Sequence, residues 1–225
     1  MNYEIRSIDY QDCKEWFLKK HYLKRLPSIS FCFGLYNKNE LIGVCSFGNA
    51  VPLTMKRSIC GEKFEHLVYE LNRLIVNDGH AKNCTSYFVS QCLKQLPKPL
   101  IVVSYADKSQ GHQGYIYQAT NFMYLGLSHT QKDWVIKGQE HKHTRTLMDE
   151  FAFTPNRIEL LKKKYGNDLY QVQREPKHRY IYFIGSKTQK QKLSKALRYE
   201  IQPYPKGENK RYDASYKPTT QVKLF

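Results

Sequence analysis

The sequence predicts an α/β (α+β) domain followed by a basic C-terminal extension. Segments typical of strands alternate with segments typical of helices through the first two thirds of the chain. Hydrophobic residues make up 41% of the 225 residues, which is enough to bury one main core. The positive charge lies mostly toward the C-terminus: residues 1–128 contain 15 Lys and Arg against 10 Asp and Glu, and residues 129–225 contain 21 against 10.

The N-terminal part of the chain predicts one helix and three strands. Asp9–His21 begins with a helix-capping residue type and has apolar residues at helical spacing. Ser30–Tyr36 and Leu41–Phe47 are apolar and rich in β-forming residues, and Asn37–Glu40 between them has a hairpin-turn composition. An irregular, basic stretch is expected next. Leu67–Val76 then alternates as a long strand does.

The central part predicts a helix, a buried strand and a polar loop. Cys84–Leu96 has apolar residues spaced four apart, and two prolines follow it. Leu100–Tyr105 is apolar throughout, as in a buried central strand. Ala106–His112 is polar, and loops that follow such strands line active sites in open α/β sheets. The further elements expected are a short helix over 113–120, a strand over 121–127, a strand at 134–136, a basic helix over 155–165 and a strand over 178–184.

The net charge of +16 predicts a polyanionic partner, with nucleic acid as the first candidate. A solvated basic face or an acidic protein partner is the alternative. We therefore expect three regions: a catalytic core over 1–128, completing strands and a helix with a basic DNA-contacting region over 129–202, and an extended basic tail over 203–225.

The remaining composition points to an intracellular chain. No apolar run approaches the roughly 18 residues of a membrane span, and the N-terminus is polar where a signal peptide is apolar. The cytoplasm is the expected location, with no membrane association. All six cysteines lie in the first 92 residues without metal-site or redox spacing, and they are interpreted as free thiols. A catalytic cysteine is the alternative to small buried apolar residues.

Three parts of this order resemble the GNAT superfamily of acyl-CoA-dependent transferases. They are the strand, loop and helix of residues 71–96, the strand LIVVSY, and the segment YIYQATNFMYLG. The resemblance implies a GNAT-like central mixed, mostly antiparallel sheet flanked by helices, and an acyl donor such as acetyl-CoA. It also implies that Tyr117 lies near the leaving thiolate. The glycine-rich pyrophosphate loop of the superfamily is matched only loosely, by Gly79, Ala81 and residues 83–86.

Several separated segments also resemble, in order, the Mom family of bacteriophage proteins. They are HYLKR, SFCFGLYNKNELIGVCSFG, YELNRLIV, KNCTSYFVSQCLK, VSYADKSQGHQGYIYQATNFMYLG and KHRYIYFIG. That family converts adenine in DNA to its carbamoylmethyl derivative and so protects phage DNA from host restriction. The resemblance implies a DNA-modifying transferase that acts on double-stranded DNA with a flipped adenine, in the cytoplasm of the host cell. A homodimer is a further hypothesis.

Four residues are the catalytic candidates: His21, Tyr22, Asp107 and Tyr117. A histidine is a general base or a metal ligand near neutral pH, although a histidine at a helix end beside basic residues also explains His21. Asp107 follows an apolar strand, so it is either a loop cap or a catalytic carboxylate that orients or deprotonates the amine. Tyr117 is the candidate acid for the departing group. A carbamoylmethyl group requires nitrogen and redox chemistry beyond acetyl transfer, so bound iron, with His21, Tyr22 and Asp107 as ligands, is a further hypothesis.

A second set of residues is expected to bind the donor and the DNA. Arg73 precedes the loop where a pyrophosphate would lie. Asn83, Thr85 and Ser86 present an amide, hydroxyls and backbone N–H groups at a helix start, of which simple capping explains one. The residues expected to contact DNA are Lys24, Arg25, His112, Lys162, Lys163, Lys164 and Arg179.

Two other functions compete with DNA modification. One is a GNAT N-acetyltransferase for a small molecule or a protein, which would bind CoA but not DNA. The other is a non-enzymatic DNA-binding, anti-restriction protein, which the charge alone permits but which leaves the polar loop of Asp107 and His112 unexplained.

Overall fold

The computed structural model describes residues 3–49, 52–140 and 142–208, and the chain forms two compact units. Unit 1 comprises Met1–Leu127 and His178–Phe225, and unit 2 comprises Ser128–Lys177. The expected boundary at residue 128 therefore coincides with the start of unit 2, whereas residues 178–202 belong to unit 1.

Unit 1 contains a seven-stranded sheet with the order β1-β2-β3-β4-β5-β9-β6. All neighbouring strands are antiparallel except β4 and β5, which are parallel. The expected α/β class with a mixed, mostly antiparallel sheet is thus confirmed. The strands are β1 (Tyr3–Ser7), β2 (Phe31–Asn37), β3 (Glu40–Gly48), β4 (Val68–Val76), β5 (Leu100–Ala106), β6 (Met123–Leu127) and β9 (His178–Ile184).

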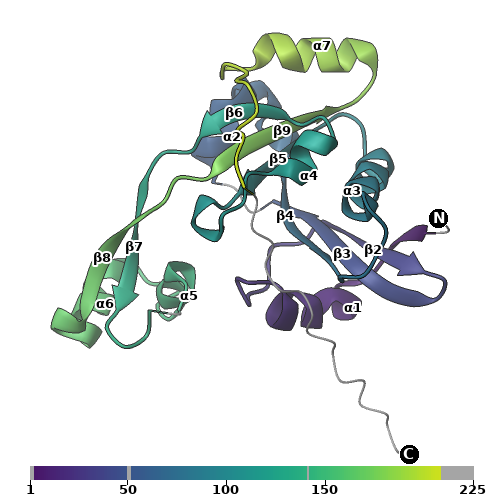
Figure 1. Cartoon of the computed structure of the whole chain (residues 1–225). Coiled ribbons are helices and arrows are strands. Elements are labelled where there is room, and N and C mark those ends of the chain that lie inside the picture. The colour runs from purple at the N-terminus through teal and green to yellow at the C-terminus, as the bar shows by residue number, and fades with distance from the viewer. Residues whose placement is uncertain (1–2, 50–51, 141, 209–225) are drawn as a thin grey trace, which may run out of the picture. The chain divides into compact units, whose positions relative to one another are not determined.

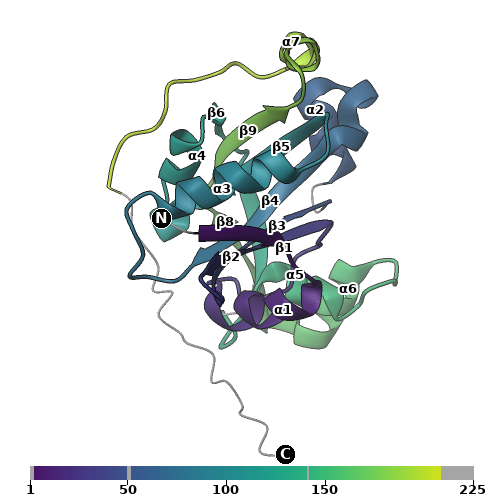
Figure 2. The same cartoon turned by 90° about the vertical axis from the view of Figure 1, so that its right-hand side faces the viewer.

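Helices cover both faces of this sheet (Figures 1 and 2). One face packs against α3 (Cys84–Gln95) and α4 (Tyr115–Ala119), and the other packs against α1 (Tyr10–Glu15), α2 (Leu53–Cys60) and α7 (Lys187–Ala196). The short turns are η1 (Trp16–Lys20), which continues α1 as a π-helix, and the 3-10 turns η2 (Glu62–Leu67) and η3 (Lys108–Gln110).

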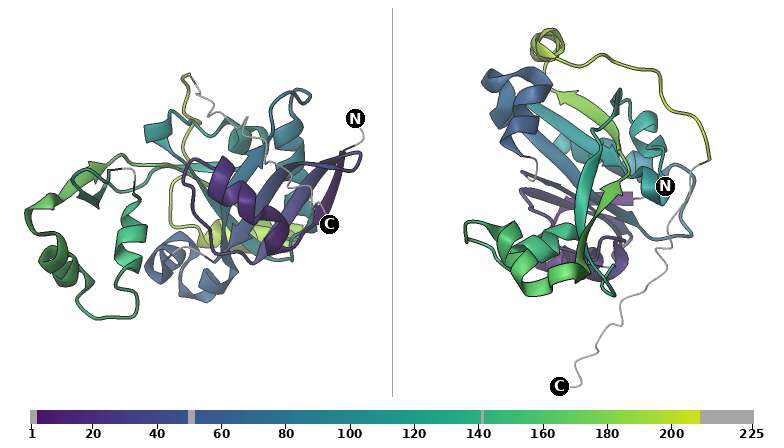
Figure 3. Two further views of the ribbon diagram at one scale, coloured as in Figure 1. Left: turned by 90° about the horizontal axis from the view of Figure 1, so that it is seen from below. Right: turned by 90° about the vertical axis from the view of Figure 1, so that its left-hand side faces the viewer.

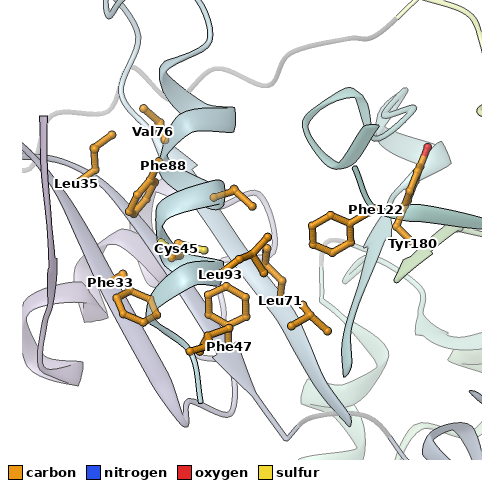
Figure 4. Packing of buried hydrophobic residues seen from close by; sticks show 14 of the residues in the cluster. Phe33, Leu35, Cys45, Phe47, Leu71, Val76, Phe88, Leu93, Phe122 and Tyr180 are labelled. Carbon is orange, nitrogen blue, oxygen red and sulfur yellow. The ribbon is translucent and has the colours of Figure 1, made fainter. Parts of the chain in front are cut away.

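The main core lies between α3 and the sheet (Figure 4). Period-two alternation along the strands sends Phe33 and Phe47 to this face, where they pack with Phe88 of α3. The opposite face is filled by Ile59 and Cys60 of α2, among others, against alternate residues of β5 and β9. Strands that are apolar on both faces, such as β5, therefore occupy the centre of the sheet.

Unit 2 is a two-stranded antiparallel hairpin covered by two helices (Figure 3). Its elements are β7 (Gln131–Ile136), α5 (Thr144–Asp149), α6 (Arg157–Tyr165), the 3-10 turn η4 (Gly166–Asp168) and β8 (Leu169–Arg174). A small core of Ile136, Leu147, Leu161 and Leu169 holds them together.

The prediction of an irregular stretch before β4 is wrong, because this part of the chain contains α2 and η2. Two basic residues interrupt the apolar pattern of LTMKRSIC, yet Ile59 and Cys60 still reach the core.

The expected tail begins as extended chain at residue 203, and Tyr204 anchors it by donating its hydroxyl to the Phe122 carbonyl at 2.8 Å. The rest of that tail, residues 209–225, lies outside the described residues. The six cysteines are buried and free, as expected.

Candidate active site

The site begins where the two parallel strands end. The ladder between β4 and β5 joins only Val68–Glu70 to Ile101–Val103, and the Ser104 hydroxyl then donates to the Leu71 carbonyl at 3.0 Å. In the part of the chain that the structure describes, the rest of β4 has no ladder partner on β5. Because the strands are parallel, both carboxyl ends lie at this edge of the sheet, where α/β folds usually bind ligands.

A β-bulge in β4 lies next to this break in the ladder. Ser46 pairs with Arg73 while Phe47 pairs with Leu71, so Asn72 is the extra residue. Its side chain accepts from the Ser46 hydroxyl at 2.7 Å and donates to the Ser28 carbonyl at 2.7 Å. Bulges of this kind redirect strand residues beside active sites.

His21 is held against the end of β4 by the π-helical turn before it. The His21 N–H donates to the Trp16 carbonyl at 3.0 Å, and the Lys20 ammonium donates to the Asn77 amide oxygen at 2.5 Å while lying 3.8 Å from the Trp16 ring centre. His21 is buried, and its Nδ1 accepts the Leu23 N–H at 3.1 Å. An acceptor at Nδ1 places the proton of the neutral ring on Nε2.

Tyr22 joins His21 to the loop that follows β5. The Tyr22 ring stacks on His21 with centroids 4.4 Å apart, and it meets the His112 ring edge-on at 6.0 Å. The His112 N–H donates to the Asp107 carbonyl at 3.1 Å. The rings of His21 and His112, from two distant stretches of sequence, are thus connected through Tyr22, and the backbone of Asp107 begins the loop that carries His112. These four residues are hereafter the site cluster.

Asp107 is buried and caps the 3-10 turn η3. One carboxylate oxygen accepts from the Ser109 N–H at 3.1 Å and from the Ser109 hydroxyl at 2.7 Å. The predicted capping role is therefore confirmed, and the cap fixes the direction of the carboxylate. A catalytic role stays a prediction beside it.

Tyr117 lies on α4, within a group of aromatic rings. Its ring centre is 5.4 Å from Phe122 and 5.3 Å from Tyr180. The Tyr180 hydroxyl donates to the Gln113 carbonyl at 2.5 Å, which connects this group to the loop after β5. Burial raises the pKa of Tyr180 to about 12, so that hydroxyl stays protonated.

His178 is a buried histidine beside the strand end that leads into Asp107, and the sequence did not single it out. It pairs with Ala106, directly before Asp107, and only 6% of it is exposed. Its Nδ1 lies 2.9 Å from the Tyr124 hydroxyl, and its buried Nε2 has no hydrogen-bond partner among the described residues. Burial, with a smaller contribution from the Lys108 charge, lowers the pKa of His178. In the sequence it is simply the first residue of a strand, so no spacing signalled it.

The predicted donor-binding residues lie on β4 and at the start of α3. Arg73 is buried and donates to the carbonyls of Asn72 at 2.6 Å and Arg25 at 3.1 Å. Asn83 has left-handed backbone and makes no side-chain cap, while the Ser86 hydroxyl donates to its carbonyl at 3.0 Å. The first turn of α3, which includes Thr85, contains no acidic residue. An anion is favourable at such a helix start.

The residues predicted to contact DNA differ in their surroundings. Lys24 is exposed and lies two residues after Tyr22 of the site cluster, and its backbone N–H donates to the His21 carbonyl at 2.8 Å. Lys162 and Lys163 are exposed on α6, whereas the neighbouring Lys164 pairs with Glu150 at 2.7 Å.

Arg179 is buried in this structure. Only 5% of it is exposed, and its guanidinium lies 4.5 Å from the centre of the Tyr199 ring. A contact of Arg179 with DNA stays a prediction.

The described residues contain neither a metal-binding cluster nor a membrane-spanning helix. No three His, Cys, Asp or Glu side chains come close enough together there to hold a metal ion. In the described ranges, no helix has the length and apolar character that crossing a bilayer requires.

Known proteins with similar folds include acetyltransferases. A GNAT-family acetyltransferase from Bacillus cereus matches with 10% identity and a TM-score of 0.42 over 81% of this chain and 98% of that chain. A putative acetyltransferase from Salmonella typhimurium, solved with its cofactor acetyl-CoA, matches with 10% identity and a TM-score of 0.43 over 83% of this chain and 96% of the other.

A phage protein is more similar to this chain in sequence than these acetyltransferases are. The methylcarbamoylase Mom of Escherichia phage Mu is 29% identical over 192 residues, which cover 83% of this chain and 77% of the phage protein. The profile of the Mom protein family matches residues 2–206. The chain therefore belongs to the Mom protein family and is a modifying transferase.

Proposed function

We propose that this protein converts the exocyclic amine of adenine in double-stranded DNA to its carbamoylmethyl derivative. The observation that carries the proposal is the site cluster, which gathers His21, Tyr22, His112 and Asp107 at the common carboxyl end of β4 and β5. Family membership and the net charge of +16 support DNA as the substrate, and the name methylcarbamoylase of the phage Mu relative supports the group that is transferred. Protection of phage DNA from restriction is the expected consequence.

The amine must leave the base stack before it can react. Its nitrogen lone pair is conjugated with the purine ring, and in duplex DNA the amine is also paired. Extracting a base costs a few kcal/mol, which phosphate contacts and stacking on aromatic rings offset. Exposed Lys24 supplies a cation next to the stacked rings of His21 and Tyr22.

The hydrogen bonds and positions of the residues assign roles to three of the four catalytic candidates. When a carbon atom bonds to the amine nitrogen, that nitrogen must lose a proton. Asp107 is an acceptor of fixed direction and is assigned as the base. Neutral His21, with its proton on Nε2, is assigned as a hydrogen-bond donor rather than as the base expected from the sequence. Tyr117 is assigned as the acid for the departing group.

An acyl thioester such as acetyl-CoA is the proposed donor of the two carbon atoms. The positive end of α3, with Thr85 and Ser86, suits the diphosphate of such a donor, and Arg73 lies on the adjacent strand. The nitrogen of the carbamoyl group comes from a second reactant, an amine that displaces the CoA thiolate from the carbonyl carbon. Joining the methyl carbon to the adenine nitrogen removes two electrons, so a two-electron oxidant is a third reactant. Iron has no support from the described side chains, since they form no three-member His, Cys, Asp or Glu group, and no step depends on it.

Plasmid protection tests the proposal. Plasmid DNA from cells that express the protein should resist endonucleases whose recognition sites contain adenine, and it should remain sensitive to those whose sites contain only guanine and cytosine. Asp107→Asn should abolish protection, because it keeps the capping oxygen but removes the base. Ser109→Ala should leave most of the protection, because it weakens the cap but keeps the carboxylate.

The opposite pattern would identify a different function or role. If Asp107→Asn protects fully and Ser109→Ala does not, Asp107 is a loop cap only. If plasmid DNA from cells with the parent protein is not protected, and the purified protein acetylates small amines, the protein is an N-acetyltransferase. Protection that survives all site substitutions would favour a DNA-binding, anti-restriction protein without catalysis.

A further inference from the structure

Two phenylalanines in one turn of unit 2 have opposite environments. The turn between α5 and α6 contains Phe151 and Phe153. Phe151 packs against the small core formed by Leu147 and Leu161, with their neighbours. Phe153 is 98% exposed, more than any other large hydrophobic residue described.

The backbone of this turn holds Phe153 outward. The Thr154 N–H and hydroxyl both donate to the Phe151 carbonyl, at 3.3 Å and 2.7 Å, and the Ala152 N–H donates to Asp149 at 3.1 Å. Phe153 itself has φ 68°, a left-handed conformation that bulky residues rarely adopt. Exposure and backbone strain both lower stability, and no burial of the ring compensates for them.

The charges around this turn favour a nucleic acid as its partner. Residues 128–177 contain ten Lys and Arg against seven Asp and Glu. α6 begins four residues after Phe153 and presents exposed Lys162 and Lys163. An apolar ring on the same small unit as solvated cations suits duplex DNA, because cations bind phosphates while the ring inserts between bases.

We propose that Phe153 is a wedge that inserts into the base stack of DNA bound by unit 2. The wedge unstacks one base step and so lowers the cost of extracting an adenine. This inference rests on DNA being the substrate, as in the proposed function.

The test is the fluorescence of 2-aminopurine, which rises when the base loses its stacking neighbours. The probe is a duplex oligonucleotide in which each adenine adjoins a 2-aminopurine, titrated with the full-length protein. Phe153→Ala should abolish the rise and weaken binding by about tenfold, the effect of one lost stacking contact. Phe153→Tyr should restore both. Val172→Ala removes another exposed apolar side chain of unit 2 and should change neither.

A second duplex separates a wedge from a general binding contact. When an abasic position opposite each adenine already disrupts the stack, Phe153→Ala should bind within about threefold of the parent protein, because no stacked step remains to be opened. Equal fluorescence for the parent protein and Phe153→Ala would overturn the proposal. It would also be overturned if Phe153→Ala lost the ability to bind phosphatidylserine vesicles but still bound DNA as the parent protein does.

Two outcomes distinguish the wedge from the proposed function. If the parent protein raises the fluorescence but leaves adenine unmodified, the proposed function is wrong and the wedge is supported. If Phe153→Ala modifies duplex DNA as fast as the parent protein, the wedge is wrong and the proposed function is unaffected.

Discussion

Hydrogen bonds from neighbouring residues orient the polar side chains of the site before any substrate binds. Nδ1 of His21 accepts the Leu23 N–H, whereas the Asp107 carboxylate is directed by Ser109. The same polar side chains thus provide one donor and one acceptor at a single edge of the sheet. This division of roles follows from local backbone contacts, which residue type and spacing alone do not show.

Tyr117→Phe tests the acid role at this scale. The substitution keeps the ring that packs on Phe122 and Tyr180 but removes the hydroxyl. We expect modification of adenine to slow by about 10²-fold or more, the usual contribution of a positioned acid. The rate of nucleoside modification in cell extracts measures this, with DNA affinity and melting temperature as controls. A normal rate would remove Tyr117 from the mechanism.

His178 should make the stability of unit 1 depend on pH. Burial lowers the pKa of His178 below the ordinary value of 6.5. As the pH falls below that value, the unfolded chain takes up a proton that the folded chain does not, so stability decreases. The melting temperature should therefore fall less between pH 7.5 and pH 5.5 in His178→Gln than in the parent protein. Equal slopes would show that His178 titrates normally in the fold.

At the scale of elements, the approach of α4 to β9 depends on Gly114. Gly114 has φ 76°, and an added Cβ would lie 2.5 Å from the Tyr180 ring. Gly114→Ala should lower the free energy of unfolding by roughly 1–3 kcal/mol through overpacking. Gly79→Ala is the matched control, since Gly79 has φ 84° with no atom within 4 Å of the added Cβ. Urea unfolding of both variants distinguishes overpacking from left-handed strain, and equal losses would exclude overpacking.

Long apolar runs made the central elements predictable from sequence. β5 and α3 have patterns that only a buried strand and an amphipathic helix explain. β1, α5, β8 and α7 were not predicted, because they are short or mostly solvated: α7 buries only Leu193 of its ten residues. The cluster of His21 with His112 was not visible either, since their proximity depends on how two loops meet at the strand ends.

At the scale of the molecule, unit 2 is an insertion between two neighbouring strands. β6 and β9 pair at Leu127 and His178, so the chain leaves and re-enters the sheet at facing positions. Such an insertion adds a surface without interrupting the sheet. The charge of this region is apparent from the sequence, whereas its closure as a separate unit is not, because the strand β8 that closes it is polar.

DNA binding should depend strongly on salt, since the chain carries a net charge of +16. Replacing exposed Lys162 and Lys163 together by Ala should reduce the slope of log K against log salt by about 2, through the loss of two phosphate contacts. Fluorescence anisotropy with a labelled duplex at several salt concentrations measures the slope. An unchanged slope would mean that α6 does not contact the backbone.

The most direct test of the central claim is mass spectrometry of nucleosides from plasmid DNA of cells that express the protein. We expect a deoxyadenosine heavier by one carbamoylmethyl group, with the added mass retained on the base after loss of the sugar, and we expect this product to be absent in Asp107→Asn. Unmodified deoxyadenosine in cells with the folded parent protein, or the same product from Asp107→Asn, would contradict the account.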